Sequence, residues 1–434
     1  MSSSPEPQRD VAVSVMPGTE PPALDFGKTA KYARAWGKGP VPQWPVEPTP
    51  EAIAATVEAA LKPPRETCYV ELLHEGAFTK LYVVHLTRAY WGRTEFVMRI
   101  TLPVCPRLLT ESEVAATKWA RNKLSRVPRV VTYDSSTNNP LGFEWILMTK
   151  MEGEPLSKRW HGLDSASKVD VVTNLAKLFA YSFCRPFKQI GSLREGERAN
   201  IDHDRGPFST TTDWLRSRLQ VAAAGLERSL GNSATSGDQA AITQRMLDLT
   251  KRIEKLMPTF FPPADPHAAA MADDADDGLR TVFCHDSLSM DDILVTDQGL
   301  SGILDWKCIP CLPLYAACQF PPFLRMAYDR IEEPDMRRYR VDTNASPHPS
   351  YFRDLARYEM TTLRKAYIEA IHQEAPELVA IWRRETSADL RDYQAAVDNC
   401  DNEYAIGPVS AWVEAVEAGD ASVLSKRLHE QLAE

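Results

Sequence analysis

The sequence predicts an α+β fold of two lobes, in which a small lobe built on an antiparallel sheet precedes a large, mostly helical lobe. Three features of the chain predict this order. Between Cys68 and Ile100, β-branched and aromatic residues recur in short strand-like runs. After Gly153, apolar residues recur at helical spacing. Between two of these helical segments, residues 283–306 form a loop followed by short apolar strands.

Residues 1–50 precede the first predicted element. They are rich in Pro, Ser and Gly and show little apolar periodicity, so we expect a disordered or loosely draped tail. The segment Met1–Asp10 carries acids and prolines and lacks an apolar core, which argues against a secretory signal or a transit peptide. No apolar run approaches the roughly 18 residues needed to span a bilayer. These features favour a cytoplasmic protein without a membrane partner.

The small lobe is predicted over residues 51–152. A short helix is expected over residues 51–61, before the first strand. Alternating and continuous apolar runs then predict strands over residues 69–73, 81–86, 95–100 and 145–148. A further helix is expected to open near Thr110. Residues 149–153 would form the crossover between the two lobes.

The large lobe is predicted over residues 153–434. Helical periodicity predicts helices over residues 169–182, 213–228, 239–256, 354–374, 376–384 and 389–398. Residues 262–278 are an Ala/Asp-rich stretch of low complexity, which we interpret as a solvated insertion before a strand over residues 281–284. Its Asp cluster lacks the alternation and the closing Glu of a calcium loop, so no calcium site is predicted.

The segment that follows this strand carries the chemistry. His285, Ser287-Leu288 and Asp292 lead into the apolar strand Ile293-Leu294-Val295, and Asp305 follows the next apolar run. In kinase-type phosphotransferases, His-x-Asp-Leu is followed by Asn five residues after the Asp, and a second Asp lies further along the chain. In this register Ser287 takes the position of the catalytic base, and Asp286 lies one place too early.

The roles expected in such a loop follow from the chemistry of phosphoryl transfer. The base accepts the proton of the attacking hydroxyl, and the Asn-position residue and the later Asp bind magnesium. Asp292 and Asp305 retain oxygen ligands for a hard cation, so both are predicted metal ligands. Ser287 needs an activating neighbour to act as a base at neutral pH. The candidate catalytic set is therefore His285, Asp286 and Ser287.

These motifs resemble the aminoglycoside phosphotransferase/choline kinase-like family, and in particular its large fungal branch. Besides the loop, the resemblance rests on the segment Leu312–Leu324 and on shorter matches at residues 129–131, 139–142, 148–153, 190–193, 206–208, 358–360 and 398–403. It covers roughly residues 65 to 415. The resemblance implies a bilobal protein-kinase-like fold, ATP or another nucleoside triphosphate with Mg²⁺ as cofactors, and a small-molecule acceptor.

The resemblance also implies where the nucleotide would bind. Gly76 and Lys80 lie in the turn at the nucleotide-loop position, although one glycine is also typical of a plain hairpin. Arg99 stands on the third strand where a phosphate-pairing Lys is expected, with Glu113 on the next helix as its partner. The alternative is an edge-strand Arg and a surface acid.

Two methionines at the crossover complete the predicted nucleotide site. Met148 and Met151 would line the adenine pocket, where the family offers backbone groups from the crossover to the base. A role in the hydrophobic core is an equally good interpretation of both side chains.

Composition excludes some partners. The net charge is −9, which argues against a nucleic-acid partner, since a phosphate backbone calls for a basic stripe. At 434 residues and 44% hydrophobic content, the chain can bury a large core. Its eight scattered cysteines fit reduced thiols. Cys308 and Cys311 are the one close pair, either half of a zinc or redox site or two buried thiols.

The acceptor would bind between the catalytic loop and the C-terminal helices. Acids in that region would suit a cationic acceptor or would simply solvate the helices: Glu359, Asp398, Asp401 and Glu403. Three functions stay open. The chain is an ATP- and magnesium-dependent phosphotransferase of a small hydroxylated molecule, with Asp286 or a water replacing the base; an inactive pseudokinase that acts by binding; or a kinase-fold enzyme of specialised metabolism with altered chemistry. The sequence leaves the oligomeric state open.

Overall fold

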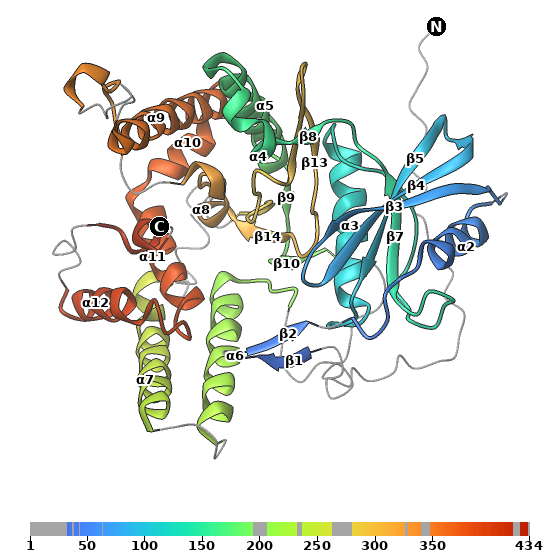
Figure 1. Ribbon diagram of the computed structural model, residues 1–434. Coiled ribbons are helices and arrows are strands. Elements are labelled where there is room, and N and C mark those ends of the chain that lie inside the picture. Colours follow the sequence, from blue (N-terminus) through green and yellow to red (C-terminus); the bar gives the residue numbers. More distant parts are fainter. Residues whose placement is uncertain are drawn as a thin grey trace, which may run out of the picture.

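The protein has a small lobe built on a sheet and a large helical lobe (Figure 1). The computed structural model describes the backbone of residues 33–36, 39–42, 44–62, 64–193, 206–231, 237–262, 280–325, 329–339, 348–419 and 426–432. Within these ranges, no helix is long and apolar enough to cross a membrane. The bilobal α+β architecture expected from the sequence is confirmed.

The small lobe contains a five-stranded antiparallel sheet with the strand order β3-β4-β5-β7-β6. Its strands are β3 (Thr67–Glu75), β4 (Thr79–Tyr90), β5 (Arg93–Thr101), β6 (Val130–Asp134) and β7 (Glu144–Thr149). Phe96, Met98 and Ile100 alternate along β5 and are buried against helix α2 (Pro50–Ala60). The intervening Arg99 points to the opposite face, toward helix α3 (Leu108–Lys123). This alternation therefore separates the hydrophobic core of the lobe from its polar inner face.

Part of the expected N-terminal tail forms regular structure, and residues 44–49 lie against this lobe. Strands β1 (Ala33–Trp36) and β2 (Gly39–Pro42) pair with each other, and the Trp44 and Phe143 rings lie 5.1 Å apart. Thr49 caps helix α2, because its hydroxyl accepts a hydrogen bond from Ala52 N at 3.2 Å. The rest of the predicted tail lies outside the described residues.

A buried carboxylate joins β7 to helix α3. Glu144 is 1% exposed, and its Oε1 accepts a hydrogen bond from Arg107 N at 2.7 Å, just before the helix begins. The second oxygen, Oε2, is buried without a hydrogen-bond partner. Burial raises the pKa of Glu144 to about 7, although the nearby Thr110 hydroxyl and the hydrogen bond from Arg107 N act in the opposite direction.

The buried carboxyl of Glu144 should make stability depend on pH. The folded state keeps this proton up to about pH 7, whereas the unfolded state releases it near pH 4.5. Stability is therefore lost as the pH rises through this window, by about 3 kcal/mol for this group. Glu144→Gln should reduce the change in the free energy of unfolding between pH 4.5 and 7. At pH 8 this variant should be more stable than the wild type. Urea unfolding across the window checks this, and parallel curves for the two proteins would contradict it.

The crossover between the lobes depends on a glycine. Gly153 has φ +108°, and a Cβ at this position would lie 2.5 Å from Ser301 Oγ and 2.7 Å from Val295 O. Val295 and Ser301 lie on the hairpin formed by residues 293–303. The crossover can approach this hairpin so closely because glycine has no side chain. The next residues form β8 (Glu154–Pro155), which pairs with β12 (Ile293–Thr296) of the large lobe.

Gly153→Ala should lower the free energy of unfolding by roughly 2 kcal/mol or more, because left-handed strain and a steric clash act together. Gly142→Ala is the matched control, since Gly142 also has a positive φ, +74°, but a Cβ at this position would have no atom within 4 Å. The control should show only the strain of about 1–2 kcal/mol. Equal losses in urea unfolding would show that the contact with the hairpin is unimportant.

The large lobe is mostly helical, with short strands around residues 284–292, the loop in which the catalytic residues are predicted. Its helices are α4 (Leu156–Arg159), α5 (Ser165–Phe183), α6 (Thr211–Gly231), α7 (Gly237–Phe260), α8 (Leu314–Ala317), α9 (Pro349–Glu374), α10 (Pro376–Arg383), α11 (Glu385–Asp398), α12 (Ile406–Glu417) and α13 (Leu428–Gln431). Its strands are β8 and β12 with β13 (Gly299–Ile303) in one sheet, and β9 (Pro186–Phe187), β10 (Gly191–Ser192), β11 (Thr281–Phe283) and β14 (Pro310–Pro313) in another.

The helices predicted from sequence are present in this lobe, and α12 was missed. Gly407 and Pro408 lie at the start of α12 and interrupt its helical pattern. The first turn of a helix tolerates proline because its N–H groups have no intrahelical partner. The predicted Ala/Asp-rich insertion falls almost entirely on residues 263–279, which lie outside the described residues.

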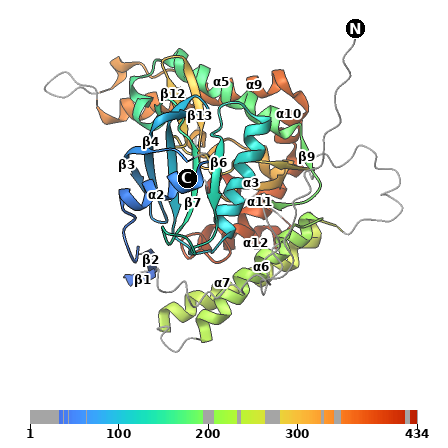
Figure 2. The same ribbon diagram turned by 90° about the vertical axis from the view of Figure 1, so that its right-hand side faces the viewer.

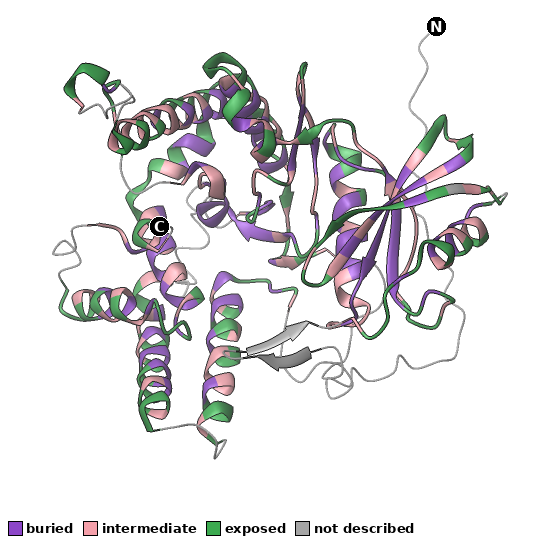
Figure 3. Cartoon of the chain, viewed as in Figure 1, coloured by how far each residue is buried: buried purple, intermediate pink, exposed green. Residues whose placement is uncertain are grey.

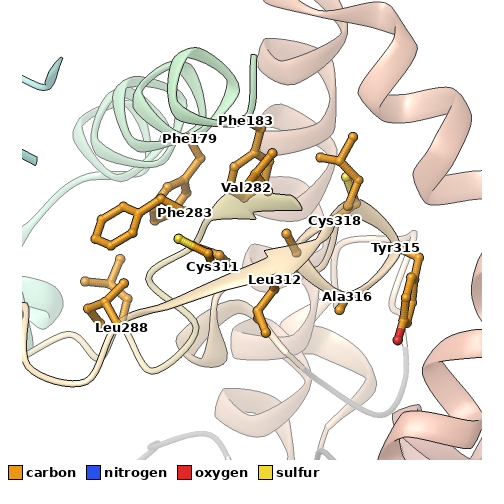
Figure 4. Close-up of a cluster of buried hydrophobic side chains, with 14 of the residues drawn as sticks. Phe179, Phe183, Val282, Phe283, Leu288, Cys311, Leu312, Tyr315, Ala316 and Cys318 are labelled. Carbon is orange, nitrogen blue, oxygen red and sulfur yellow. The ribbon is translucent and has the colours of Figure 1, made fainter. Parts of the chain in front are cut away.

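The helices bury one continuous core around the short strands. Helix α5 packs against α9, and α6 and α7 form a hairpin that projects from the lobe (Figure 2). Buried surfaces face the strands, and exposed surfaces lie mainly on the outer faces of the helices (Figure 3). Figure 4 shows Phe179 and Phe183 of α5 above β11 and β14, where the core supports the catalytic loop.

Candidate functional site

The catalytic loop, residues 284–292, connects β11 to β12 and is anchored on both sides. Phe283 before it and Leu288 within it are buried (Figure 4). The Ser182 hydroxyl donates a hydrogen bond to Phe283 O at 3.0 Å, which ties the loop to α5. Asp286 and Ser287, in contrast, are exposed. The anchors therefore fix the loop so that it presents these two side chains.

His285 is buried, and it links the loop to the segment of Asp305. Its Nε2 lies 3.0 Å from Leu304 O and donates a hydrogen bond to it, while Nδ1 is buried without a partner. The ring also packs edge-on against Trp306 at 5.0 Å. Burial lowers the pKa of His285, which favours the neutral imidazole. We therefore expect His285 to position Asp305 through Leu304, whereas the sequence predicted a direct catalytic role for His285.

The two predicted metal ligands lie on neighbouring backbone segments. Leu304 N donates a hydrogen bond to Asp292 O at 2.8 Å, so Asp305 lies one residue beyond this contact. Asp292 Oδ2 accepts hydrogen bonds from Ser289 N at 3.0 Å and from Ser289 Oγ at 2.5 Å. Asp305 has φ +56°, a strained conformation that Asp tolerates better than most residues.

Asp305 lies between two cations where the lobes meet. Arg99 Nη1 is 3.4 Å from Asp305 Oδ1, and Lys307 Nζ is 2.6 Å from Oδ2. Burial would raise the pKa of Asp305, but these two cations hold it below the usual value. Arg99 Nε also lies 3.0 Å from Glu113 Oε2, so the expected ion pair between β5 and α3 is present. Burial raises the pKa of Glu113 despite this guanidinium.

The donor set fits magnesium only with help from a ligand. Within the described ranges, no three His, Cys, Asp or Glu side chains come together to hold a metal ion. Mg²⁺ is commonly bound by one or two carboxylates together with substrate phosphates and waters. Asp292 and Asp305 meet this smaller requirement. A bound cation would have to displace Lys307 from Asp305 Oδ2.

Lys80 does not join this site. It pairs with Ile100 across the sheet, whereas Arg99 pairs with Leu81, so Lys80 and Arg99 point to opposite faces. Its ammonium contacts Glu47 and lies 2.8 Å from Glu75 Oε1. This geometry argues against the phosphate-binding role predicted for Lys80.

The predicted nucleotide loop is a β-hairpin turn. Gly76 N donates a hydrogen bond to Thr79 O at 2.8 Å, which closes the turn between β3 and β4. A Cβ at Gly76 would meet this oxygen at an ordinary 3.4 Å. The turn therefore does not depend on glycine, and its position is the remaining argument for a phosphate contact.

The two methionines lie on the inner side of the crossover. Met148 pairs with Val97 in the sheet and is half-buried, on the same face as Arg99. Met151 is also half-buried and lies beside Gly302 of β13. Both side chains are therefore close to the junction of the lobes and only partly buried in the core.

A pocket of about 220 Å³ lies between the catalytic loop and the C-terminal helices, where the acceptor was expected. Its wall is formed by α5, the segment after β14, α9, α11 and the C-terminal segment: Phe179, Phe183, Cys284, His285, Asp286, Leu312, Ala316, Ala317, Gln319, Phe320, Pro321, Arg325, Tyr367, Arg391, Gln394, Ala395, Asp398, Asn399, His429 and Leu432. Asp286 lines this pocket, whereas Ser287 is not part of its wall.

The acids considered for an acceptor are mostly engaged elsewhere. Asp398 Oδ1 lies 2.7 Å from Arg218 Nη2, and Glu359 Oε1 lies 2.7 Å from Lys168 Nζ. Asp401 and Glu403 are exposed and do not line the pocket. Of the four acids, Asp398 alone lies in the pocket wall.

Sequence reasoning missed the cations of the pocket. Arg325 directly follows the family segment that ends at Leu324, and this proximity was the available signal. Arg391 lies on α11, far along the chain, and no local pattern connects it to the loop.

The Cys308–Cys311 pair is divided between two environments. Cys311 is buried in β14, and burial raises its pKa to about 12. Cys308 is exposed, with φ +54°. The expectation of two buried thiols was therefore wrong for Cys308, because the turn after Asp305 directs it outward. Both are free thiols.

Curated relatives of this chain are fungal. A subtelomeric hrmA-associated cluster protein of Aspergillus fumigatus is 27% identical over 310 residues, which is 58% of this chain and 59% of the relative. The chain thus spans about six tenths of that protein's length. Altered inheritance of mitochondria protein 9, mitochondrial, of Candida albicans is 27% identical over 187 residues, which is 40% of this chain and 29% of the relative.

Solved structures that match this chain include aminoglycoside phosphotransferase APH(4)-Ia, with a TM-score of 0.43 and 12% identity over 84% of this chain and 98% of that one. Choline kinase from Cryptosporidium parvum has a TM-score of 0.40 and 13% identity over 84% and 86%. The model of the phosphotransferase enzyme family matches residues 80–311, more than half of the chain. The chain therefore belongs to the phosphotransferase enzyme family.

Proposed function

We propose that the chain is an ATP- and magnesium-dependent phosphotransferase that acts on a hydroxyl group of a small acceptor, with Asp286 as the base. The observation that carries this proposal is the position of Asp286. Its carboxylate lines the pocket between the catalytic loop and the C-terminal helices, next to His285. Through its bond to Leu304, His285 connects the loop to the segment of Asp305. One hydrogen bond thus links the loop that contains Asp286, at the proposed acceptor pocket, to the segment that contains Asp305, at the proposed metal site.

The environment of Asp286 supports the role of base. Although the Asp286 residue is exposed, the pocket wall desolvates its carboxyl and raises its pKa. Asp398 adds to this effect, while His285 and Arg325 partly offset it. A base whose pKa lies closer to neutrality accepts a proton more effectively, provided that it is ionised at the working pH. Ser287 occupies the base position of the motif but lies outside the pocket wall. Asp286 therefore takes over this role from the neighbouring position.

The donor side would use the residues between the lobes. Arg99, held by Glu113, keeps a permanent charge for the phosphates, and Asp292 and Asp305 would hold Mg²⁺. Magnesium bridging the phosphates neutralises charge that develops during transfer. Met148 and Met151 would contact the adenine ring at the crossover. Gly76 lies in the turn between β3 and β4, where the phosphates are expected.

A pseudokinase that acts by binding is the second candidate, and one contact favours it. Lys307 Nζ lies 2.6 Å from Asp305 Oδ2 and neutralises the carboxylate that magnesium would need. A lysine in this place could replace the cation altogether. In a pseudokinase, Lys307 would take the place of the metal ion at Asp305, and Ser287 would take the place of the base.

Magnesium-dependent nucleotide binding separates the two candidates. Isothermal titration of the full chain with ATP should show tighter binding in Mg²⁺ than in EDTA, and a panel of small alcohols should then stimulate ADP formation. Equal affinity in Mg²⁺ and EDTA, without stimulation by any alcohol, would favour the pseudokinase.

We further propose that residues 51–152 bind the nucleotide, that residues 153–434 bind the acceptor, and that the protein works in the cytoplasm without a nucleic-acid partner. Since the Candida albicans relative is named mitochondrial, imaging of a C-terminally tagged chain is the direct test.

A further inference from the structure

The pocket beside Asp286 contains a guanidinium that no carboxylate neutralises at contact distance. Arg325 Nε donates a hydrogen bond to Phe320 O at 2.8 Å, which fixes the orientation of the side chain. Arg325 makes no ion pair with any residue in the described ranges; Asp286 acts on it only at longer range. A partly buried cation without a partner is costly, so its retention in a pocket wall needs an explanation.

A second guanidinium lies in the same wall. Arg391 is 6% exposed, and it donates hydrogen bonds to Tyr315 O at 3.2 Å and to Trp382 O at 3.0 Å. Carbonyl oxygens satisfy its N–H groups but supply no net negative charge. The positive charge of Arg391 therefore adds to the potential inside the pocket.

The acids of the pocket do not cancel these charges. Asp398 Oδ1 already pairs with Arg218 Nη2 at 2.7 Å. Asp392, behind the pocket, binds His429 Nδ1 at 2.5 Å. Among the described residues of the wall, Asp286 is then the one carboxylate without an ion-pair partner. Among the residues that the structure describes, Arg325 thus has only Asp286 as a nearby carboxylate, whereas Asp392 and Glu430 partly balance Arg391 without an ion pair.

The remaining wall limits the size and polarity of the occupant. Phe179, Phe183, Phe320 and Tyr367 supply aromatic surface. The volume of about 220 Å³ is below the ~300–1,000 Å³ of pockets that hold drug-sized ligands. A short hydrocarbon segment between two polar ends would match this wall.

We propose that the acceptor is a small anionic alcohol, whose carboxylate or phosphate group binds Arg325 while its hydroxyl faces Asp286. This assignment rests on the proposed function. In the reaction, the acceptor oxygen forms a bond to the γ-phosphorus of ATP, the bond from that phosphorus to ADP breaks, and the hydroxyl proton passes to the Asp286 carboxylate. A cationic acceptor would meet two guanidinium groups and is disfavoured.

Binding of matched probes to the full chain tests this assignment without nucleotide. The probes are γ-hydroxybutyrate, hydroxypropyl phosphate, the neutral butanediol and the cationic aminobutanol, measured by isothermal titration. One or both anions should bind at least about tenfold more tightly than aminobutanol, and comparison of the two anions distinguishes a carboxylate from a phosphate. Aminobutanol binding as tightly as both anions, or more tightly, would overturn the proposal.

Substitution of Arg325 makes the test specific. Arg325→Gln should weaken binding of the preferred anion by about tenfold or more, and Arg325→Lys should restore part of it. Arg337→Gln is the control, because the Arg337 side chain is 86% exposed and contacts Asp335. Unchanged anion affinity in Arg325→Gln would contradict the proposal. If this variant fails to fold, the ranking of the probes on the wild type still decides.

Turnover is measured separately, so the two proposals can fail independently. Anion binding that depends on Arg325, without ADP formation, would refute the phosphotransferase and leave the pocket assignment intact. Phosphorylation of aminobutanol in preference to both anions would refute the anionic acceptor and leave the phosphotransferase proposal intact.

Discussion

Asp286→Asn is expected to lower turnover by roughly 10²-fold or more while ATP affinity stays unchanged. A positioned general base typically contributes 10²–10⁴-fold, and Asn keeps the size of Asp but cannot accept the proton. Asp286 lines the pocket and takes no part in the Arg99–Glu113 ion pair, so nucleotide binding should not change. ADP formation and ATP titration on the same preparation give both quantities.

The neighbouring serine provides the control for this prediction. Ser287→Ala should change turnover little, because Ser287 lies outside the pocket wall. Ser287→Asp should give no gain, since it adds a negative charge beside Asp286. A clear increase in turnover with Ser287→Asp would show that the loop still uses the base position of the motif, and would contradict the role of Asp286.

The pH dependence of turnover offers a second check on Asp286. The base must be ionised, so turnover should rise with pH through an apparent pKa above 3.8, the ordinary value for Asp. This acidic limb should be absent from the remaining activity of Asp286→Asn.

Asp305→Asn should remove the dependence of nucleotide binding on magnesium. The substitution keeps the shape of the side chain but removes the charge that a hard cation needs. We expect ATP affinity in Mg²⁺ to fall to the value measured in EDTA, and turnover to fall by roughly 10²-fold or more, because a metal contributes several kcal/mol to the transition state.

Asp297→Asn is the matched control for Asp305. The Asp297 side chain is 91% exposed in the turn between β12 and β13, and it pairs with Arg159. Its substitution should leave both quantities unchanged. Magnesium dependence that survives in Asp305→Asn would mean that the metal binds elsewhere and would contradict the role of Asp305.

Local patterns in the sequence were sufficient to predict most elements of the fold, including the strands on either side of the proposed catalytic loop. The apolar run Ile293-Leu294-Val295 sets the register of the loop, and Arg99 and Glu113 were expected to meet from their places on a strand and the following helix. In the structure their atoms lie 3.0 Å apart. Strand alternation and helix periodicity decide such positions locally, so they can be inferred without a structure.

Features that depend on sheet register or on distant segments could not be predicted. Lys80 adjoins the predicted nucleotide loop, but the pairing of β4 with β5 turns it to the opposite face from Arg99. The pocket combines Asp286 with Arg325 and Arg391, which come from separate parts of the chain. Which of Asp286 and Ser287 lines the pocket is also a tertiary property.

The central claim is phosphoryl transfer to an acceptor hydroxyl with Asp286 as the base. Phosphorus NMR of full-length protein with ATP, Mg²⁺ and the best-binding alcohol tests it most directly. The wild type should form a phosphate ester of the alcohol and ADP in equal amounts, and Asp286→Asn should form both at least about 100-fold more slowly. Formation of AMP, release of free phosphate without an ester, or an undiminished rate in Asp286→Asn would contradict the account.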